Sequence, residues 1–150
     1  MDKYKVAIVD DDEVALENLS FELGKDARFF LKGTARNGKQ GKKLIAKVQP
    51  DLLFLDVELP DMTGMELLQE IRDSVSWNMR IVFYTAYEKY MIQAIREAAF
   101  DYLLKPFEEQ VVRDILARFV EQAEPGQRMS YPIGAPVHTG QTFIVFTPTN

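Results

Sequence analysis

The sequence predicts an α/β protein in which helices cover both faces of an open, mostly parallel sheet. Two periodicities alternate along the chain: short runs that are apolar at every residue, and longer amphipathic segments with helical spacing. Five such pairs follow one another in strict alternation, which is typical of parallel strands joined by crossover helices. The 150 residues are enough for one domain of this kind with a sizeable core.

The five predicted strands share one property. Each is short and apolar at every residue, which suits strands that are covered by helices on both faces. Their carboxyl ends should meet at one edge of the sheet, where open parallel sheets bind ligands. In chain order, the apolar runs are Val6–Val9, Phe29–Leu31, Leu52–Leu55, Ile81–Tyr84 and Tyr102–Leu104.

A predicted helix follows each strand, with apolar residues recurring every three or four positions. Gly24 is the expected C-cap of the first helix, and Pro50 should stop the second. The helical stripes are, in order, Leu16, Leu19 and Leu23; Leu44, Ile45 and Val48; Met65, Leu68 and Ile71; Ile92, Ile95 and Ala99; and Val112, Ile115, Leu116 and Phe119.

Composition excludes several classes of protein. Eighteen basic and 23 acidic side chains give a net charge of −5, which does not favour a domain that coats nucleic acid or an anionic membrane. The absence of cysteine excludes disulfides and thiolate chemistry, and the single histidine, His138, excludes sites that need two imidazoles. No apolar run is long enough to span a membrane. We therefore expect a globular, cytoplasmic protein.

The carboxyl-terminal segment differs from the rest of the chain. We expect one domain over residues 1–122, and over 123–150 a linker or the start of a truncated output domain. Four prolines interrupt that segment, and only Phe143–Phe146 has the pattern of a strand. One strand cannot bury itself, so this segment is not expected to form a domain alone.

Polar residues with complementary chemistry stand at the ends of four predicted strands. The first strand leads into four consecutive acids at 10–13, the third ends at Asp56, the fourth at Thr85 and the fifth at Lys105. Each has an ordinary structural interpretation: the acids as an N-cap and first helical turn, Asp56 as a turn residue, Thr85 as a strand end and Lys105 as a solvated lysine. Their placement on one edge instead favours a shared site.

The chemistry available to these residues is narrow. Clustered carboxylates repel one another unless a hard cation binds between them, and oxygen ligands favour Mg²⁺. A carboxylate, Mg²⁺, an ammonium and a hydroxyl can together hold a phosphoryl group. Asp56 would attack phosphorus and form an acyl phosphate, while Lys105 and Thr85 would bind the phosphoryl oxygens.

Four motifs together resemble the receiver domain of bacterial two-component response regulators. Ile8–Asp11 matches the acidic pair of that family, and Leu53–Gly64 matches its phosphoacceptor strand with the Pro-x-Met-x-Gly loop. Thr85 and Ala86 match the switch threonine and its small successor. Asp101–Phe107 matches the lysine motif. The resemblance covers roughly residues 3–121.

This resemblance implies a fold and a set of site residues. The fold is flavodoxin-like: a doubly wound, five-stranded parallel sheet of order 2-1-3-4-5 with five helices, and a cis bond between Lys105 and Pro106. Asp11 and Asp56 would bind Mg²⁺ directly, together with the backbone carbonyl of Glu58. Asp10 would act mainly through water, and the acids at 12 and 13 would have no direct role.

The resemblance also implies partners and a switch. A sensor histidine kinase would transfer the phosphoryl group to Asp56, and the chain would not be an enzyme in its own right. Thr85 and Tyr102 would form the conformational switch, and the phosphorylated chain would form a homodimer through helix four, strand five and helix five. Residues 99–107 resemble receivers joined to a LytTR-type domain, so DNA would be bound only through an output domain absent from this chain.

Three other interpretations remain open. A haloacid-dehalogenase-type phosphatase uses similar groups, but its acidic pair follows the lysine and its second acid is an aspartate where this chain has Glu58. A flavodoxin-like mononucleotide binder would need a hydroxyl- or glycine-rich loop after the first strand, where this chain has the acidic residues 10–13. A receiver-shaped interaction module that is never phosphorylated would not need the residues that bind Mg²⁺ and the phosphoryl group, and this sequence has all of them.

Overall fold

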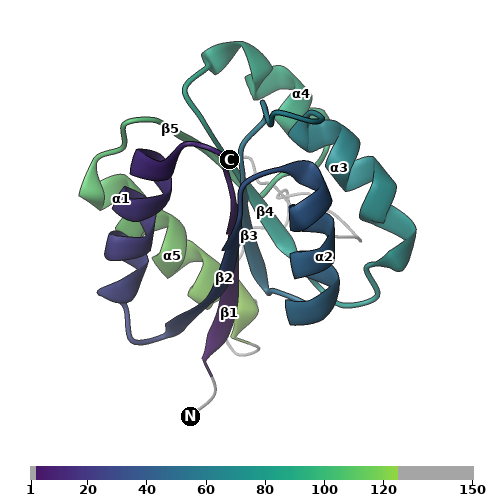
Figure 1. Ribbon diagram of the computed structural model, residues 1–150. Coiled ribbons are helices and arrows are strands. Elements are labelled where there is room, and N and C mark those ends of the chain that lie inside the picture. The colour runs from purple at the N-terminus through teal and green to yellow at the C-terminus, as the bar shows by residue number, and fades with distance from the viewer. Residues whose placement is uncertain (1–2, 125–150) are drawn as a thin grey trace.

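Five parallel strands form a single sheet in the order β2-β1-β3-β4-β5 (Figure 1). The structure is a computed structural model that describes residues 3–124. The chain begins near the middle of the sheet, builds one edge and then returns across β1 to build the other. This confirms the predicted doubly wound fold. The strands are β1 (Tyr4–Val9), β2 (Phe29–Ala35), β3 (Leu52–Leu55), β4 (Arg80–Thr85) and β5 (Asp101–Leu104).

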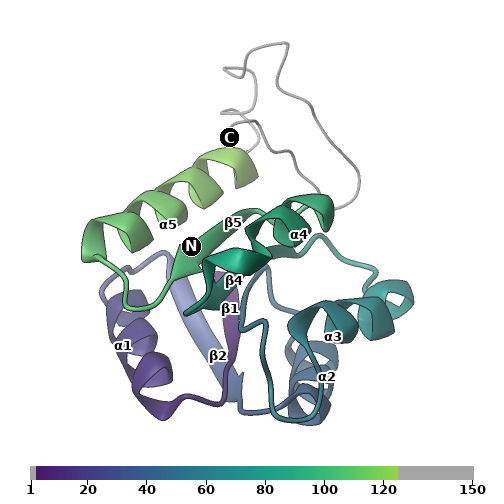
Figure 2. The same ribbon diagram turned by 90° about the horizontal axis from the view of Figure 1, so that it is seen from above.

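Helices cover both faces of the sheet, as predicted. In Figure 2, α1 and α5 lie on one side of the sheet, and α2, α3 and α4 lie on the other. Two short 3₁₀ turns, η1 (Arg72–Ser74) and η2 (Glu88–Tyr90), follow α3 and β4. The helices are α1 (Glu13–Gly24), α2 (Gly38–Val48), α3 (Gly64–Ile71), α4 (Met91–Arg96) and α5 (Glu109–Ala123).

Alternate residues of β1 enter different cores. Val6 and Ile8 belong to the core beneath α1 and α5, whereas Ala7 and Val9 belong to the core beneath α2, α3 and α4. All four are fully buried, and each larger side chain of this kind contributes about 1.5–3 kcal/mol to stability. The run is apolar at every residue because the sheet is covered on both faces.

Strand β2 differs from the other strands and from its prediction. It extends to Ala35, well beyond the predicted end at Leu31. Phe29 and Ala35 are buried, but Lys32 and Thr34 are exposed because β2 lies at the edge of the sheet. An edge strand needs apolar residues at only some positions. The continuous apolar run in the sequence therefore covers only Phe29–Leu31, the first part of β2.

The predicted apolar face of the fourth helix is wrong for two of its three residues. Ile92 and Ile95 are 66% and 58% exposed, whereas Ala94 and Ala99 are buried against the sheet. Helix α4 has only six residues, and Ala98 follows it with a φ of 60°. That left-handed residue turns the backbone, so Ala99 does not continue the face that carries the two isoleucines.

The end of α1 also differs from its prediction. Gly24 is the last helical residue, and Lys25 is the C-cap in a right-handed conformation. The amide of Lys25 donates to the carbonyls of Glu22 and Leu23, which closes the helix with tighter turns. No left-handed glycine is needed there, so the expected glycine cap is absent.

The described region ends just after α5. That helix ends at Ala123, next to the predicted domain boundary, while the predicted strand Phe143–Phe146 lies outside the described residues. Within residues 3–124, no helix combines the length and apolar character that crossing a bilayer requires. The predicted division of the chain at 122/123 stays a prediction.

Candidate functional site

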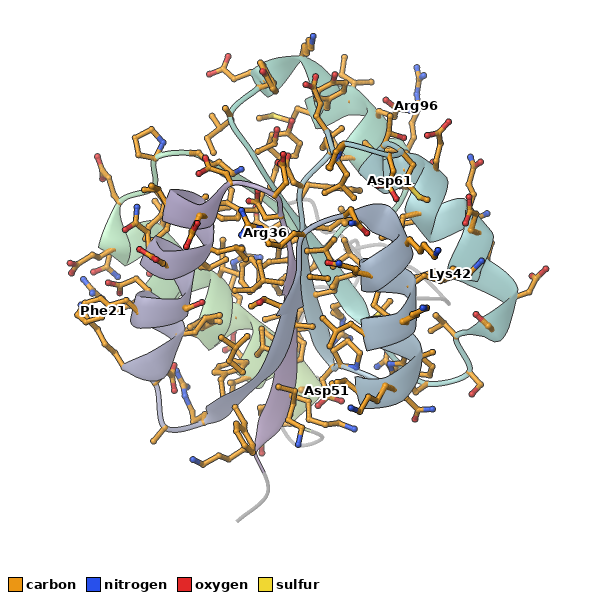
Figure 3. The ribbon with its side chains drawn as sticks, viewed as in Figure 1. Phe21, Arg36, Lys42, Asp51, Asp61 and Arg96 are labelled. Atoms are coloured by element: carbon orange, nitrogen blue, oxygen red, sulfur yellow. The ribbon has the colours of Figure 1, made fainter. Side chains whose placement is uncertain are left out.

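The polar residues singled out by the sequence lie at the carboxyl ends of the strands. Figure 3 labels Arg36, directly after β2, at this edge and Asp51, directly before β3, at the opposite edge. Arg36 also donates a hydrogen bond to the carbonyl of Asp11, at 3.2 Å, and so joins the loop after β2 to the loop after β1. At the carboxyl-terminal edge of the sheet, where the site was predicted, the loops after β1 and β2 are therefore in direct contact.

Three charged residues form the centre of the site. The ammonium of Lys105 lies 2.7 Å from Oδ2 of Asp10 and 3.2 Å from Oδ2 of Asp56. Asp10 is fully buried, and Asp56 is 6% exposed. A single cation thus neutralises part of the charge of two buried carboxylates, which costs less than leaving either of them unpaired.

Burial and pairing oppose each other at this centre. Burial raises the pKa of Asp10 to about 6, although the hydrogen bond from Lys105 works in the opposite direction. For Lys105, burial favours the neutral form, but the hydrogen bond to Asp10 and the charge of Asp56 outweigh it and raise its pKa. The amine therefore stays charged, while Asp10 takes up a proton at a higher pH than an ordinary aspartate does.

The carboxylates are arranged as an oxygen-ligand site. Asp10, Asp11 and Asp56 each offer an oxygen, and these atoms all lie within 4.8 Å of one another. Asp11 is exposed, so the group opens to solvent on its side. Mg²⁺ binds few protein oxygens and keeps several waters, and the donor set fits that ion.

Asp12 has a separate, structural role. Its carboxylate accepts hydrogen bonds from the amides of Val14 and Ala15 and caps α1. Its own amide donates to Oδ1 of Asp10, at 2.9 Å, and fixes that buried carboxylate. The ordinary interpretation of the acidic run is therefore correct for this residue, whereas its neighbours Asp10 and Asp11 face the site.

The loop after β3 is shaped by close backbone packing around Asp56. A Cβ atom at Gly64 would lie 2.5 Å from the carbonyl oxygen of Asp56, so only glycine fits. Thr63 and Glu66 then form a capping box that starts α3. The amide of Glu58 lies 3.3 Å from Oδ1 of Asp56. The Pro-x-Met-x-Gly pattern thus sets the backbone beside Asp56.

The predicted switch residues lie on adjacent strands. Thr85 is fully buried at the end of β4, and its carbonyl accepts a 2.9 Å hydrogen bond from the amide of Lys105. Its hydroxyl lies 3.4 Å from the amide of Tyr87. Tyr102 is half-buried on β5, and its phenol donates to the carbonyl of Tyr87. The loop after β4 is thus held by both residues, and the expected Lys105–Pro106 cis bond is present.

Two tyrosines of the site were not identified from the sequence. The ring of Tyr84 lies beneath Lys105, with its centroid 5.0 Å from the ammonium, and its hydroxyl donates to the carbonyl of Ala15 at 3.0 Å. Tyr90 donates to the carboxylate of Glu58 from the far side of the site. A polar ring inside the fourth apolar run was the only signal for Tyr84, and spacing alone gives none for Tyr90.

Comparison with known sequences points to one family. The model of the family described as "Response regulator receiver domain" matches residues 6–117. The transcriptional regulatory protein BtsR of Escherichia coli strain K12 is 38% identical over 118 residues, which cover 79% of this chain and 48% of that protein. An uncharacterized response regulatory protein of Vibrio cholerae is 35% identical over 115 residues, covering 77% and 48%. The chain spans about half the length of these curated relatives.

Solved structures agree with this similarity. The REC domain of AraT, a response regulator from Geobacillus stearothermophilus, superposes with a TM-score of 0.74 at 29% identity, covering 83% of this chain and 98% of that one. The response regulatory domain of protein mrkE from Klebsiella pneumoniae gives a TM-score of 0.71 at 30% identity, covering 77% and 94%. Both share the fold of this chain over nearly their whole length.

Proposed function

The chain belongs to the response regulator receiver domain family, and on that basis we propose that Asp56 accepts a phosphoryl group from a sensor histidine kinase. The observation that carries the proposal is the centre of the site, where Lys105 contacts both Asp56 and the buried Asp10. A carboxylate at the end of a central strand, with a cation beside it, is placed to attack phosphorus.

Each residue has a defined part in the transfer. A bond forms between a carboxylate oxygen of Asp56 and phosphorus, and the bond between phosphorus and the donor's histidine nitrogen breaks. Lys105 and the Thr85 hydroxyl would bind the oxygens of the transferred group. Asp11, Asp56 and the carbonyl of Glu58 would hold Mg²⁺, with Asp10 acting through water. When bound, Mg²⁺ neutralises charge that develops on the phosphoryl oxygens.

The first prediction is that Asp56 is the sole acceptor. Incubation with a divalent cation and a small acyl phosphate should add one phosphoryl group to the protein, measured as intact mass. Asp56→Asn should show no addition, because an amide is not nucleophilic toward phosphorus. Full labelling of Asp56→Asn would contradict the assignment of the nucleophile.

The same labelling, combined with an assay of phosphate-ester turnover, separates the competing functions. A haloacid-dehalogenase-type phosphatase would turn over phosphate esters repeatedly, whereas a receiver is labelled once per chain. An interaction module that is never phosphorylated would not be labelled with any donor. Single labelling without ester turnover supports a phosphoacceptor that is not an enzyme in its own right.

We place the phosphorylation-dependent dimer on the face formed by α4, β5 and α5. Met91, Ile92 and Ile95 are exposed there, although large apolar side chains favour burial. Asp101 and Arg118 already form an ion pair within the chain, so these charges are balanced before any partner binds. A two-fold axis through this face would join the apolar residues of one protomer to those of its partner.

The output is proposed from the relatives and from the sequence. BtsR is named a transcriptional regulatory protein, and we propose that this chain controls transcription through a DNA-binding output domain beyond it. The pattern of residues 99–107 and the apolar run Phe143–Phe146 favour an output domain of LytTR type. We also propose a cytoplasmic location, from the absence of cysteine and of a long apolar run in the sequence. Binding of DNA by a longer natural chain, with none by residues 1–122, would test this division.

A further inference from the structure

A bridge of side chains joins the two loops that flank the site. The phenol of Tyr90 donates to the carboxylate of Glu58, and the ammonium of Lys89 lies 3.9 Å from the same carboxylate. Lys89 also lies 5.1 Å and 5.2 Å from the ring centroids of Tyr87 and Tyr90. We call this group of contacts between Glu58, Tyr90 and Lys89 the Glu58–Tyr90 bridge.

Both ends of this bridge are fixed to residues of the site. On one side, the backbone amide of Glu58 lies 3.3 Å from Asp56. On the other side, the ring of Tyr90 packs edge-on against that of Tyr87, whose amide lies 3.4 Å from the hydroxyl of Thr85. The bridge therefore connects the loop of the phosphoacceptor with the loop of the switch threonine.

The bridge lies on the exposed surface next to Asp56. Asp56 is 6% exposed and forms the floor, whereas the side chain of Glu58 is 42% exposed. Loss of the phosphoryl group requires water to reach phosphorus on the side opposite the Asp56 oxygen. A new bond joins the water oxygen to phosphorus, the bond to Asp56 breaks, and the carboxylate leaves with the electron pair while water releases a proton.

From this geometry we infer that Tyr90 is a positioning residue whose hydrogen bond to Glu58 closes one side of the site and prolongs the life of the phosphoryl group. The inference rests on the proposed function of Asp56. Tyr90 does not touch the reacting atoms; it acts by holding the Glu58 side chain and the loop after β4 in place. A chain without this bond exposes phosphorus to water more often.

The test measures the decay of phosphorylated protein after the donor is removed. Tyr90→Phe keeps the ring and removes only the hydroxyl, so decay should become about fivefold faster, the factor that corresponds to losing one hydrogen bond. Tyr4→Phe is the matched control, because the Tyr4 hydroxyl donates to a glutamate, Glu124, at 2.6 Å. Tyr4 begins β1, at the opposite edge of the sheet. Its variant should decay at the wild-type rate.

Variants of Glu58 show whether Tyr90 acts through that residue. Glu58→Ala should accelerate decay as much as Tyr90→Phe, and the double variant should be no faster than either single variant. Glu58→Gln removes the charge but keeps an oxygen that accepts from Tyr90, so its decay should stay near the wild-type rate. Rescue by this conservative variant would not follow from a merely electrostatic or structural role.

Several outcomes would overturn the inference. A wild-type decay rate for Tyr90→Phe would show that the hydroxyl does not matter. Multiplicative effects in the double variant, or fast decay of Glu58→Gln, would show that the bridge is not the cause. Failure of the wild-type protein to be labelled at all would instead overturn the proposed function, and this inference with it.

Discussion

The buried carboxylate of Asp10 belongs to the candidate site and lowers the free energy of unfolding at neutral pH. Burial raises its pKa to about 6, above the ordinary value of 3.8. Between these values the folded protein holds a proton that the unfolded chain releases. The free energy of unfolding should therefore fall as pH rises from about 4 to about 6.

Replacing Asp10 tests this cost directly. Asp10→Asn keeps an oxygen that accepts from the amide of Asp12 and removes the buried charge. We expect it to raise the free energy of unfolding by about 1–2 kcal/mol at pH 7 and to flatten the decline between pH 4 and 6. Urea unfolding across this pH range measures both effects. Lower stability of Asp10→Asn at pH 7 would mean that the ion pair with Lys105 outweighs burial.

Asp11 and Asp12 are adjacent acids with different predicted roles. Asp11→Asn should weaken Mg²⁺ binding, because its carboxylate belongs to the group of converging oxygens. Asp12→Asn should bind Mg²⁺ nearly as the wild-type protein does, since its oxygen caps α1 and asparagine caps a helix equally well. Calorimetric titration with Mg²⁺ compares the two. Equal weakening would show that the metal ligands are wrongly assigned.

At the level of elements, the loop after β3 connects the site to α2. The carboxylate of Asp61 accepts from the amides of Gly38 and Lys39, at 2.7 Å and 3.0 Å, and caps that helix from a neighbouring loop. Hydrogen bonds from these amides lower the pKa of Asp61. Figure 3 labels Asp61 close to the start of α2. The position of the loop that carries Glu58 thus depends on a helix distant in sequence.

Helix α4 offers a test of whether its exposed apolar residues contribute to the stability of the fold. Because Ile92 and Ile95 are exposed, changing both to Gln should alter the free energy of unfolding by no more than about 0.5 kcal/mol per site. The buried Ile115 of α5 is the contrast, and Ile115→Ala should cost about 2–5 kcal/mol. Thermal or urea unfolding measures the difference. A large loss from the α4 changes would mean that these residues support the fold.

The whole molecule is proposed to act as a two-state switch. The phosphoryl group adds about two negative charges and three acceptor oxygens beside Thr85. Movement of that hydroxyl toward the group would free space behind β4 for Tyr102, whose phenol now holds the carbonyl of Tyr87. Only a few kcal/mol of differential binding are needed to shift such a balance.

Sedimentation tests the switch and the dimer together. Wild-type protein should be mainly monomeric without a phosphoryl mimic and dimeric with one. Thr85→Ala should stay monomeric in both conditions, since it lacks the hydroxyl that follows the phosphoryl group. The same mass change in both proteins, or none in the wild type, would contradict the mechanism.

The sequence predicted the framework of the fold and the residues that lie together at the candidate site. Strands covered on both faces are apolar throughout, so all five strands contain a short apolar run in the sequence, and three of these runs lead to Asp56, Thr85 and Lys105. The resemblance to receiver domains implied the strand order, which the structure confirms. The sequence did not show the full extent of β2, because this edge strand carries the exposed polar residues Lys32 and Thr34 beyond its apolar start.

Only the tertiary structure decided which side of a helix or loop packs against which neighbour. Sequence periodicity placed Ile92 inside, but the short α4 and the left-handed Ala98 leave it exposed and bury Ala94 instead. Likewise, Tyr90 is 32 residues from Glu58 in the chain, and only the packing of the two loops brings them into contact. Local sequence determines which residues favour burial or bind phosphate and metal, because that is a property of each side chain. Contacts between loops depend on the relative positions of whole elements, and so they are decided by the packed molecule.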